Sequence, residues 1–317
     1  MQRRRALMLI GLALPLAGVA RPLAAQGLLR QGPIAALVPF ATAPFPYDGA
    51  VPGTGAPFLD VDQDGREGHS SPRGGVYWAD SNYSDNTVLV MLTRGFRIDR
   101  PAVMIVYFHG NGATLAADVI NRQRVVDQVE AAGVNAVLVA PQFAVNALDS
   151  SAGKFWQPGA FAQFLEEAAR HLAQLYGKAG ATRAFSRLPI VLIAYSGGYN
   201  PAAYALTVGG AAARVRGVVL LDAAFGEPDR FATFIAAARR NAFFLSAYTD
   251  ASEAGNEMIR NSLRARGIGS SSDLPDRLGP GYVGFVASPG NHDDFVTDAW
   301  VDDPVTWVMT HMTFAHR

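Results

Sequence analysis

The chain has 317 residues, of which half are hydrophobic and 17% are charged. That is enough apolar material for a substantial core and too little charge for a disordered chain. The formal net charge is zero and the pI is near 7, so nothing in the charge balance points to a nucleic acid or an anionic membrane surface as a partner. The chain contains no Cys, so no disulfide can support the fold in any compartment.

Residues 1–25 have the layout of a signal peptide. A basic stretch at 1–5 precedes an apolar run at 6–20, and small residues at 23–25 offer a cleavage point before Gln26. The apolar run is short for a membrane span of about 20 residues, so we expect cleavage and not a retained anchor, which is the alternative. The pair Arg4-Arg5 also resembles a twin-arginine signal. A periplasmic or secreted protein without a stable membrane span is therefore expected.

Residues 26–75 are rich in Gly, Pro and Asp and show little periodicity, which predicts a loop-rich N-terminal segment packed over the main domain. Within it, Asp60, Asp62, Asp64 and Gly65 match the first half of a calcium-binding loop. The motif requires a bidentate Glu at its twelfth position, and this chain has Ser71 there. A solvated acidic turn is expected, with a calcium site in this loop as the alternative.

From residue 76 onward, short apolar runs alternate with segments of helical periodicity. Strands are expected at 76–78, 87–92, 103–108, 136–140, 190–194, 215–221, 243–248 and 282–286. Helices are expected at 114–132, 158–176, 201–208, 231–240 and 253–266, and from 292 onward. The alternation predicts an α/β fold over residues 76–317, with a mostly parallel central sheet and helices on both faces. Ligands of such sheets bind at the carboxyl ends of the strands.

The segment Ala194-Tyr195-Ser196-Gly197-Gly198 follows the strand expected at 190–194 and precedes a helix marked by Pro201. A serine hydroxyl is a poor nucleophile unless it is exposed beside a base and near oxyanion donors. A sharp turn from strand to helix exposes Ser196, and it aims the N–H of Gly197 toward a developing oxyanion.

This segment resembles the nucleophile elbow Gly-x-Ser-x-Gly of the α/β-hydrolase superfamily, with Ala194 in place of the first Gly. The resemblance covers residues of about 85–317. It implies an α/β-hydrolase fold and a serine nucleophile, Ser196.

Further residues match the superfamily in its chain order. His109-Gly110-Asn111 follows a buried strand, where the resemblance implies a second oxyanion N–H, from Gly110 or Asn111, with His109 shaping the turn. His292 follows the last expected strand, where the superfamily has its general base.

Two aspartates fit the position of the acid that orients the base. Asp250 follows the penultimate strand, which is the more common place in the superfamily, and Asp222 ends the strand before it. The sequence leaves both open.

Four aromatic residues near the carboxyl ends of the strands are candidates for the substrate pocket, namely Tyr195, Phe143, Trp156 and Phe225. The stretch 142–157 could form a small lid over them.

Together these features predict an exported serine hydrolase that cleaves a carboxylic ester through an acyl-enzyme. The alternatives are a peptidase or amidase that acts on cell-envelope peptides, and a non-catalytic envelope protein with the same fold. We expect a small-molecule ester or peptide as the partner, and no cofactor, metal or nucleic acid.

Overall fold

The computed structural model of the chain describes residues 32–314. The expected signal peptide at 1–25 lies outside the described residues. Within residues 32–314, no helix combines the length and the apolar character that crossing a membrane requires.

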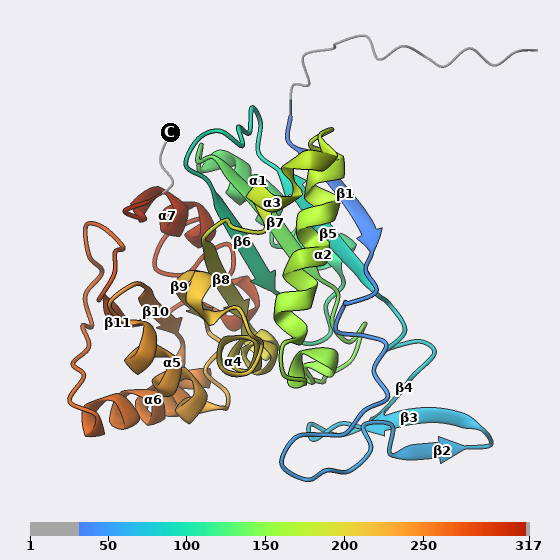
Figure 1. Ribbon diagram of the computed structural model, residues 1–317. Helices are drawn as coiled ribbons and strands as arrows, with labels where there is room; N and C mark the ends of the chain where they lie inside the picture. The colour runs from blue at the N-terminus through green and yellow to red at the C-terminus, as the bar shows by residue number, and fades with distance from the viewer. Residues whose placement is uncertain (1–31, 315–317) are drawn as a thin grey trace, which may run out of the picture. The chain divides into compact units, whose positions relative to one another are not determined.

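An eight-stranded sheet forms the centre of the described chain (Figure 1). Only one strand, β5, runs against the others, because it pairs antiparallel with both of its neighbours, while all remaining pairs are parallel. In spatial order the strands are β1 (Ile34–Pro39), β5 (Thr87–Leu92), β7 (Ala136–Pro141), β6 (Val103–Phe108), β8 (Ile190–Tyr195), β9 (Val215–Leu221), β10 (Phe243–Tyr248) and β11 (Val283–Ala287).

Helices cover both faces of this sheet (Figure 1). One face packs against α2 (Ala160–Leu175), α3 (Thr182–Phe185), α4 (Tyr199–Thr207), α5 (Pro228–Ala238) and α6 (Glu253–Ala265). The other packs against the π-helical segment η1 (Leu115–Arg122), α1 (Val125–Ala131) and α7 (Pro304–His311). Short 3-10 segments complete the element set: η2 (Gly153–Trp156), η3 (Ala179–Ala181), η4 (Ser196–Gly198), η5 (Ala212–Arg214), η6 (Asp250–Ser252) and η7 (His292–Asp294). The expected fold class, a mostly parallel sheet with helices on both faces, is confirmed.

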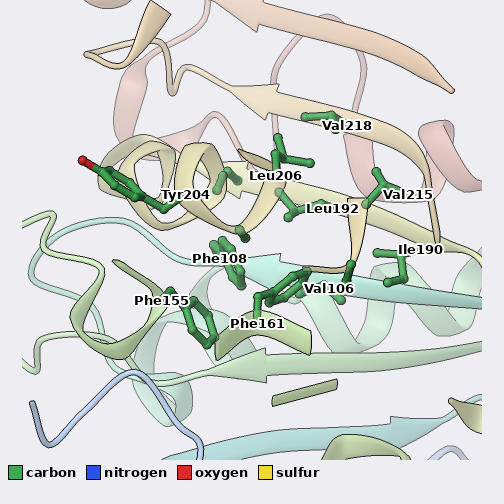
Figure 2. Close-up of a cluster of buried hydrophobic side chains, with 14 of the residues drawn as sticks. Val106, Phe108, Phe155, Phe161, Ile190, Leu192, Tyr204, Leu206, Val215 and Val218 are labelled. Carbon is green, nitrogen blue, oxygen red and sulfur yellow. The ribbon is translucent and has the colours of Figure 1, made fainter. Parts of the chain in front are cut away.

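The strands β7, β6 and β8 contain no charged residue and are buried at every position because both faces of the sheet are covered. In β6, Val106 and Phe108 pack toward α2 and α4, while Ile105 packs toward η1 and α1. Figure 2 shows the cluster on the first of these faces, in which Phe161 of α2 lies beside Phe108. The two ring centroids are 6.0 Å apart with the planes at 78°. Truncating such a buried ring costs about 3–5 kcal/mol, so this packing fixes the strand end that precedes the His109 turn.

The N-terminal segment contributes more regular structure than expected. β1 joins the central sheet at its edge, which the sequence analysis missed because its side chains alternate between half-buried and exposed and include three small or Pro residues. A separate three-stranded sheet contains β2 (Val61–Gln63), β3 (Arg66–Ser70) and β4 (Val76–Trp78). The strand expected at 76–78 therefore belongs to the small sheet, and residue 75 is not a structural boundary.

The acidic motif of this segment forms the β2–β3 hairpin. Asp62 Oδ1 accepts from the N–H of Gly65 at 3.0 Å, and Asp60 Oδ1 accepts from the N–H of Ser70 at 2.8 Å. Among residues 32–314, no group of three or more His, Cys, Asp or Glu side chains could hold a metal ion.

Three further expectations need correction. The helix expected at 114–132 is broken, because Arg124 takes a left-handed conformation (φ 51°) between η1 and α1. The terminal helix begins at Pro304 and not at His292. The stretch 142–157 does not project as a lid, because Phe143 and Phe155 anchor it in the core.

Candidate active site

Ser196 lies at a sharp turn between β8 and α4. Its φ is 50°, a left-handed conformation that a non-glycine residue adopts only under constraint. Small neighbours make the turn possible. A Cβ on Gly198 would meet the carbonyl oxygen of His109 at 3.0 Å, and a Cβ on Gly110 would meet Ser196 Cβ at 2.8 Å. The turn after β6 is thus pressed against the elbow.

Three side chains from different strand ends meet at this turn. His292 Nε2 lies 2.9 Å from Ser196 Oγ, and His292 Nδ1 lies 2.6 Å from Asp222 Oδ2. Ser196 follows β8, Asp222 follows β9, and His292 follows β11, so the three come from the carboxyl ends of the strands. In chain order they are Ser, Asp and His.

Asp222 is fully buried and is surrounded by donors. Besides His292, its carboxylate accepts hydrogen bonds from the Thr249 hydroxyl at 2.7 Å, from the Thr249 N–H at 3.0 Å and from the Ser252 hydroxyl. Burial acts to raise the pKa of Asp222, but the hydrogen bonds from His292, Ser252 and Thr249 outweigh it and hold the pKa below its usual value. The carboxylate is therefore ionised and fixed, and it presents one oxygen to the imidazole.

Asp250, the other candidate acid, is not in contact with His292. It is exposed and begins the 3-10 segment η6, while Thr249 and Ser252 on either side of it point their hydroxyls at Asp222. The loop after β10 therefore supplies hydrogen-bond donors to the acid and not the acid itself.

The predicted oxyanion donors line one narrow space beside Ser196. Gly110, Asn111 and Gly197 face it, together with Phe143 and Ser150. The Asn111 carboxamide fills the position that a Cβ on Gly197 would take, which explains the need for glycine there. Its Oδ1 accepts from Ser150 Oγ at 3.1 Å, and its buried Nδ2 has no partner among the described residues.

His109 is part of the turn's scaffold. Its Nε2 accepts hydrogen bonds from the Phe143 N–H at 2.9 Å and from Gln142 at 3.1 Å, and its Nδ1 donates to the Gly110 carbonyl. Burial lowers the pKa of His109 to about 4, so the ring is neutral at pH 7. The hydrogen bonds of the ring hold the turn in place, and the ring has no contact with Ser196.

Two of the predicted pocket residues contact the His292 side chain. The Tyr195 ring stacks on the imidazole with centroids 5.2 Å apart, and its hydroxyl donates to the His292 carbonyl at 2.8 Å. Phe225 lies edge-on to the same imidazole at 5.7 Å. These contacts fix the orientation of the ring.

The other two pocket candidates, Phe143 and Trp156, line two different spaces, and Ser150 lines both of them. Phe143 is 5% exposed and faces the narrow space beside Gly110 and Asn111. Trp156 lines an adjoining cavity of about 240 Å³ and donates from Nε1 to Asn200 at 3.1 Å. A larger cavity of about 380 Å³ lies near Val215, at the opposite end of β9 from Asp222, and is remote from this site.

Sequence reasoning missed much of this adjoining cavity. One wall comes from the N-terminal segment, which lies outside the resemblance, and the other includes Tyr199, three residues after Ser196. Tyr199 lies on the first turn of the helix after the elbow. Its spacing from Ser196 could have indicated from the sequence that Tyr199 lies near Ser196. The lining residues are Val51, Pro52, His69, Ser71, Pro72, Arg73, Asp149, Ser150, Ser151, Trp156, Tyr199, Asn200, Tyr204 and Glu227.

No known protein family and no curated protein matches the sequence. Among solved structures, the chain is similar to a mutant of the feruloyl esterase module from Clostridium thermocellum complexed with sinapinate, with 14% identity and a TM-score of 0.46 over 86% of this chain and 99% of that one. An S-formylglutathione hydrolase from Agrobacterium tumefaciens matches with 14% identity and a TM-score of 0.43 over 79% and 97%. A poly(3-hydroxybutyrate) depolymerase from Bordetella parapertussis matches with 14% identity and a TM-score of 0.42 over 80% and 85%.

These sequence identities and TM-scores are low, and the topology of the chain itself defines its fold. The sheet is parallel except for β5, Ser196 stands at a strand-to-helix elbow, and the meeting side chains follow in the order Ser, Asp, His. The protein has the α/β-hydrolase fold.

Proposed function

We propose that the protein is a serine hydrolase that cleaves carboxylic esters through a covalent acyl-enzyme. The observation that carries this proposal is the continuous contact from Ser196 Oγ through His292 to the buried carboxylate of Asp222. Each of the two contacts is within hydrogen-bond distance, which nucleophilic catalysis by serine requires.

In the proposed reaction, His292 Nε2 takes the proton of Ser196 Oγ as the oxygen attacks the ester carbonyl carbon. Asp222 accepts from Nδ1–H, which holds the imidazole in the tautomer whose Nε2 is free, and it stabilises the imidazolium that forms. The N–H of Gly197 and the turn at Gly110 and Asn111 would stabilise the negative oxygen of the tetrahedral intermediate.

Collapse of that intermediate expels the alcohol, which takes the proton from His292. Water then enters, gives a proton to Nε2, attacks the acyl-enzyme and releases the acid, and Ser196 recovers its proton. No step requires a cofactor.

Labelling with a fluorophosphonate probe and a screen of esters and peptides test the proposal. We expect labelling of the wild-type protein at Ser196 and hydrolysis of a short-chain 4-nitrophenyl ester, with both lost in Ser196→Ala. Exposed Ser81 lies in the loop between β4 and β5, so Ser81→Ala serves as a matched control that should keep both. Labelling with cleavage of peptides and not esters would favour the amidase alternative, and activity retained in Ser196→Ala would refute the mechanism.

We also propose that the protein is exported, on the basis of the basic and apolar residues at 1–20 and the small residues before Gln26. Expression with a C-terminal tag in a Gram-negative host tests this. We expect a processed form that begins near Gln26 in the periplasm, and Arg4→Lys with Arg5→Lys should retain the precursor in the cytoplasm if the signal is of the twin-arginine type. An unprocessed chain in the cytoplasm of wild-type cells would contradict export.

A further inference from the structure

The cavity beside the elbow has walls from two distant parts of the sequence. Tyr199 and Asn200 come from the first turn of α4, directly after the nucleophile, while Ser71 and Arg73 come from the turn between β3 and β4. The volume of about 240 Å³ is enough for a small acyl or alcohol group and not for a large ligand. A group that extends from an ester bound at Ser196 would enter this space.

The turn that carries Arg73 is held in place. The Ser71 hydroxyl donates to the Leu148 carbonyl at 2.7 Å, which ties the turn to the stretch beside the oxyanion turn. Within the turn, the Arg73 N–H donates to Ser71 Oγ at 3.2 Å, and the Gly74 N–H donates to the Ser71 carbonyl at 2.9 Å. These hydrogen bonds therefore fix the position of the Arg73 backbone relative to the site.

The Arg73 guanidinium lies over the ring of Phe225, which in turn contacts His292. Its Cζ lies 5.5 Å from the centroid of the Phe225 ring, and that ring lies 5.7 Å from the His292 imidazole. The Tyr199 hydroxyl is also near the positive charge of this guanidinium. Burial raises the pKa of Tyr199, and the charge of Arg73 opposes that rise. Arg73 is thus at the junction of the cavity and the Ser196–His292 pair.

The other charged groups of the cavity wall already have partners. Glu227 forms an ion pair with Arg230 at 2.9 Å. The buried carboxylate of Asp149 accepts from the Tyr83 hydroxyl at 2.9 Å and from the N–H and hydroxyl of Ser151 at 3.1 and 2.9 Å.

His69 is likewise engaged, because its Nδ1 donates to the Phe58 carbonyl at 2.7 Å and lies 3.3 Å from Asp60. Arg73 also lines the cavity, and among the residues described no carboxylate lies within ion-pair distance of its guanidinium.

We propose that Arg73 binds a carboxylate of the substrate, so that the preferred substrates are esters that carry a second, free carboxylate group. This inference rests on the proposed function and names its substrate class. A planar guanidinium can form two parallel hydrogen bonds with a carboxylate, and the cation–π contact with Phe225 uses none of its N–H groups. The Tyr199 hydroxyl in the same cavity supplies a further donor for the bound group.

The experiment compares two series of 4-nitrophenyl esters of equal chain length. One series has half-esters of dicarboxylic acids from succinate to suberate, and the other has the corresponding neutral monoacids. A second pair, phenyl acetate and 3-carboxyphenyl acetate, places the carboxylate on the alcohol side. We expect at least one carboxylate-bearing ester to exceed its neutral partner in kcat/KM by about fivefold or more, mainly through KM, at low ionic strength.

Arg73→Gln should reduce the ratio of kcat/KM for the carboxylate-bearing ester to that for its neutral partner to about one, and Arg73→Glu should reduce that ratio below one. Arg66→Gln is the matched control, because Arg66 belongs to the same small sheet and lies over an aromatic ring, Trp78, at 4.6 Å, but does not line the cavity. It should keep the preference.

Two results would overturn the inference, and they are distinguishable. If neutral esters are hydrolysed with dependence on Ser196 but no carboxylate-bearing ester is preferred, or if Arg73→Gln keeps the preference, the role of Arg73 is wrong and the hydrolase proposal stands. If no ester of either series is hydrolysed, the proposed function fails and the substrate class fails with it.

Discussion

Asp222→Asn replaces the buried acid with a side chain of the same shape and a different hydrogen-bonding capacity. Four donors converge on the carboxylate, from His292, Ser252 and both the N–H and the hydroxyl of Thr249. A carboxamide accepts through one oxygen only, and its NH₂ would face a donor. His292 can restore the contact by adopting the other tautomer, but Nε2 then carries the proton and cannot take one from Ser196. We expect kcat to fall by about 10⁴-fold.

The same substitution also affects stability. Asp222 has no exposed surface, so a mismatched amide cannot find water, and an unsatisfied buried polar group costs about 1–3 kcal/mol. In a domain of this size we expect Tm to fall by about 2–10 °C, with the protein still folded at 25 °C.

Steady-state ester hydrolysis and thermal unfolding, each measured on Asp222→Asn and Asp250→Asn, test both effects. Asp250 is exposed and follows the next strand of the sheet, which makes it a matched control, and we expect its variant to stay within about twofold of wild type. The reasoning would be refuted if Asp250→Asn lost more activity than Asp222→Asn, or if Asp222→Asn kept more than a tenth of the wild-type kcat.

Further predictions concern the turn after β6, the elbow and the base. Because the pKa of His109 is lowered from 6.5 to about 4 in the folded state, the unfolded chain binds more protons between these values, and stability should fall by up to about 3 kcal/mol as pH drops through that window. Urea unfolding at pH 7 and pH 4.5 measures this, and a pH dependence that persists in full in His109→Gln would contradict it. Gly197→Ala should displace the Asn111 carboxamide, lower Tm through overpacking and lower kcat by about 100-fold, whereas a folded variant with wild-type activity would exclude this space as the oxyanion site. Tyr195→Phe loses the 2.8 Å hydrogen bond to the His292 carbonyl, and we expect a kcat reduction of about threefold to tenfold, measured against Tyr282→Phe as the control.

Much of the sheet could be predicted because burial on both faces leaves a compositional signal. β6 and β8 are uninterrupted apolar runs, and β10 is interrupted only by Ser246; the bounds of all three in the structure agree with expectation to within a residue. β1 carries no such signal, since an edge strand with half-buried side chains resembles a loop in sequence.

Ser196 and His292 could be predicted because the resemblance to the α/β-hydrolase superfamily gives their places after particular strands, and chain order identifies those places. The choice between Asp222 and Asp250 could not be predicted, because they follow neighbouring strands and the contact of His292 with Asp222 depends on the folded arrangement, in which Thr249 and Ser252 also donate to that carboxylate. Arg73 could not be found at all, since its position depends on how the small sheet folds back onto the stretch that contains Leu148.

Ser196 and Asp222 share a feature with an evolutionary consequence, for both have left-handed backbones, with φ values of 50° and 43°. Such a conformation costs a non-glycine residue about 1–2 kcal/mol, and glycine would relieve it. At Ser196, selection for a more stable protein and selection for turnover therefore act in opposite directions, whereas at Asp222 the hydrogen bonds to the carboxylate favour the acid on both counts. A lineage released from its substrate should drift to glycine at position 196, and Ser196→Gly should melt at a higher temperature than Ser196→Ala.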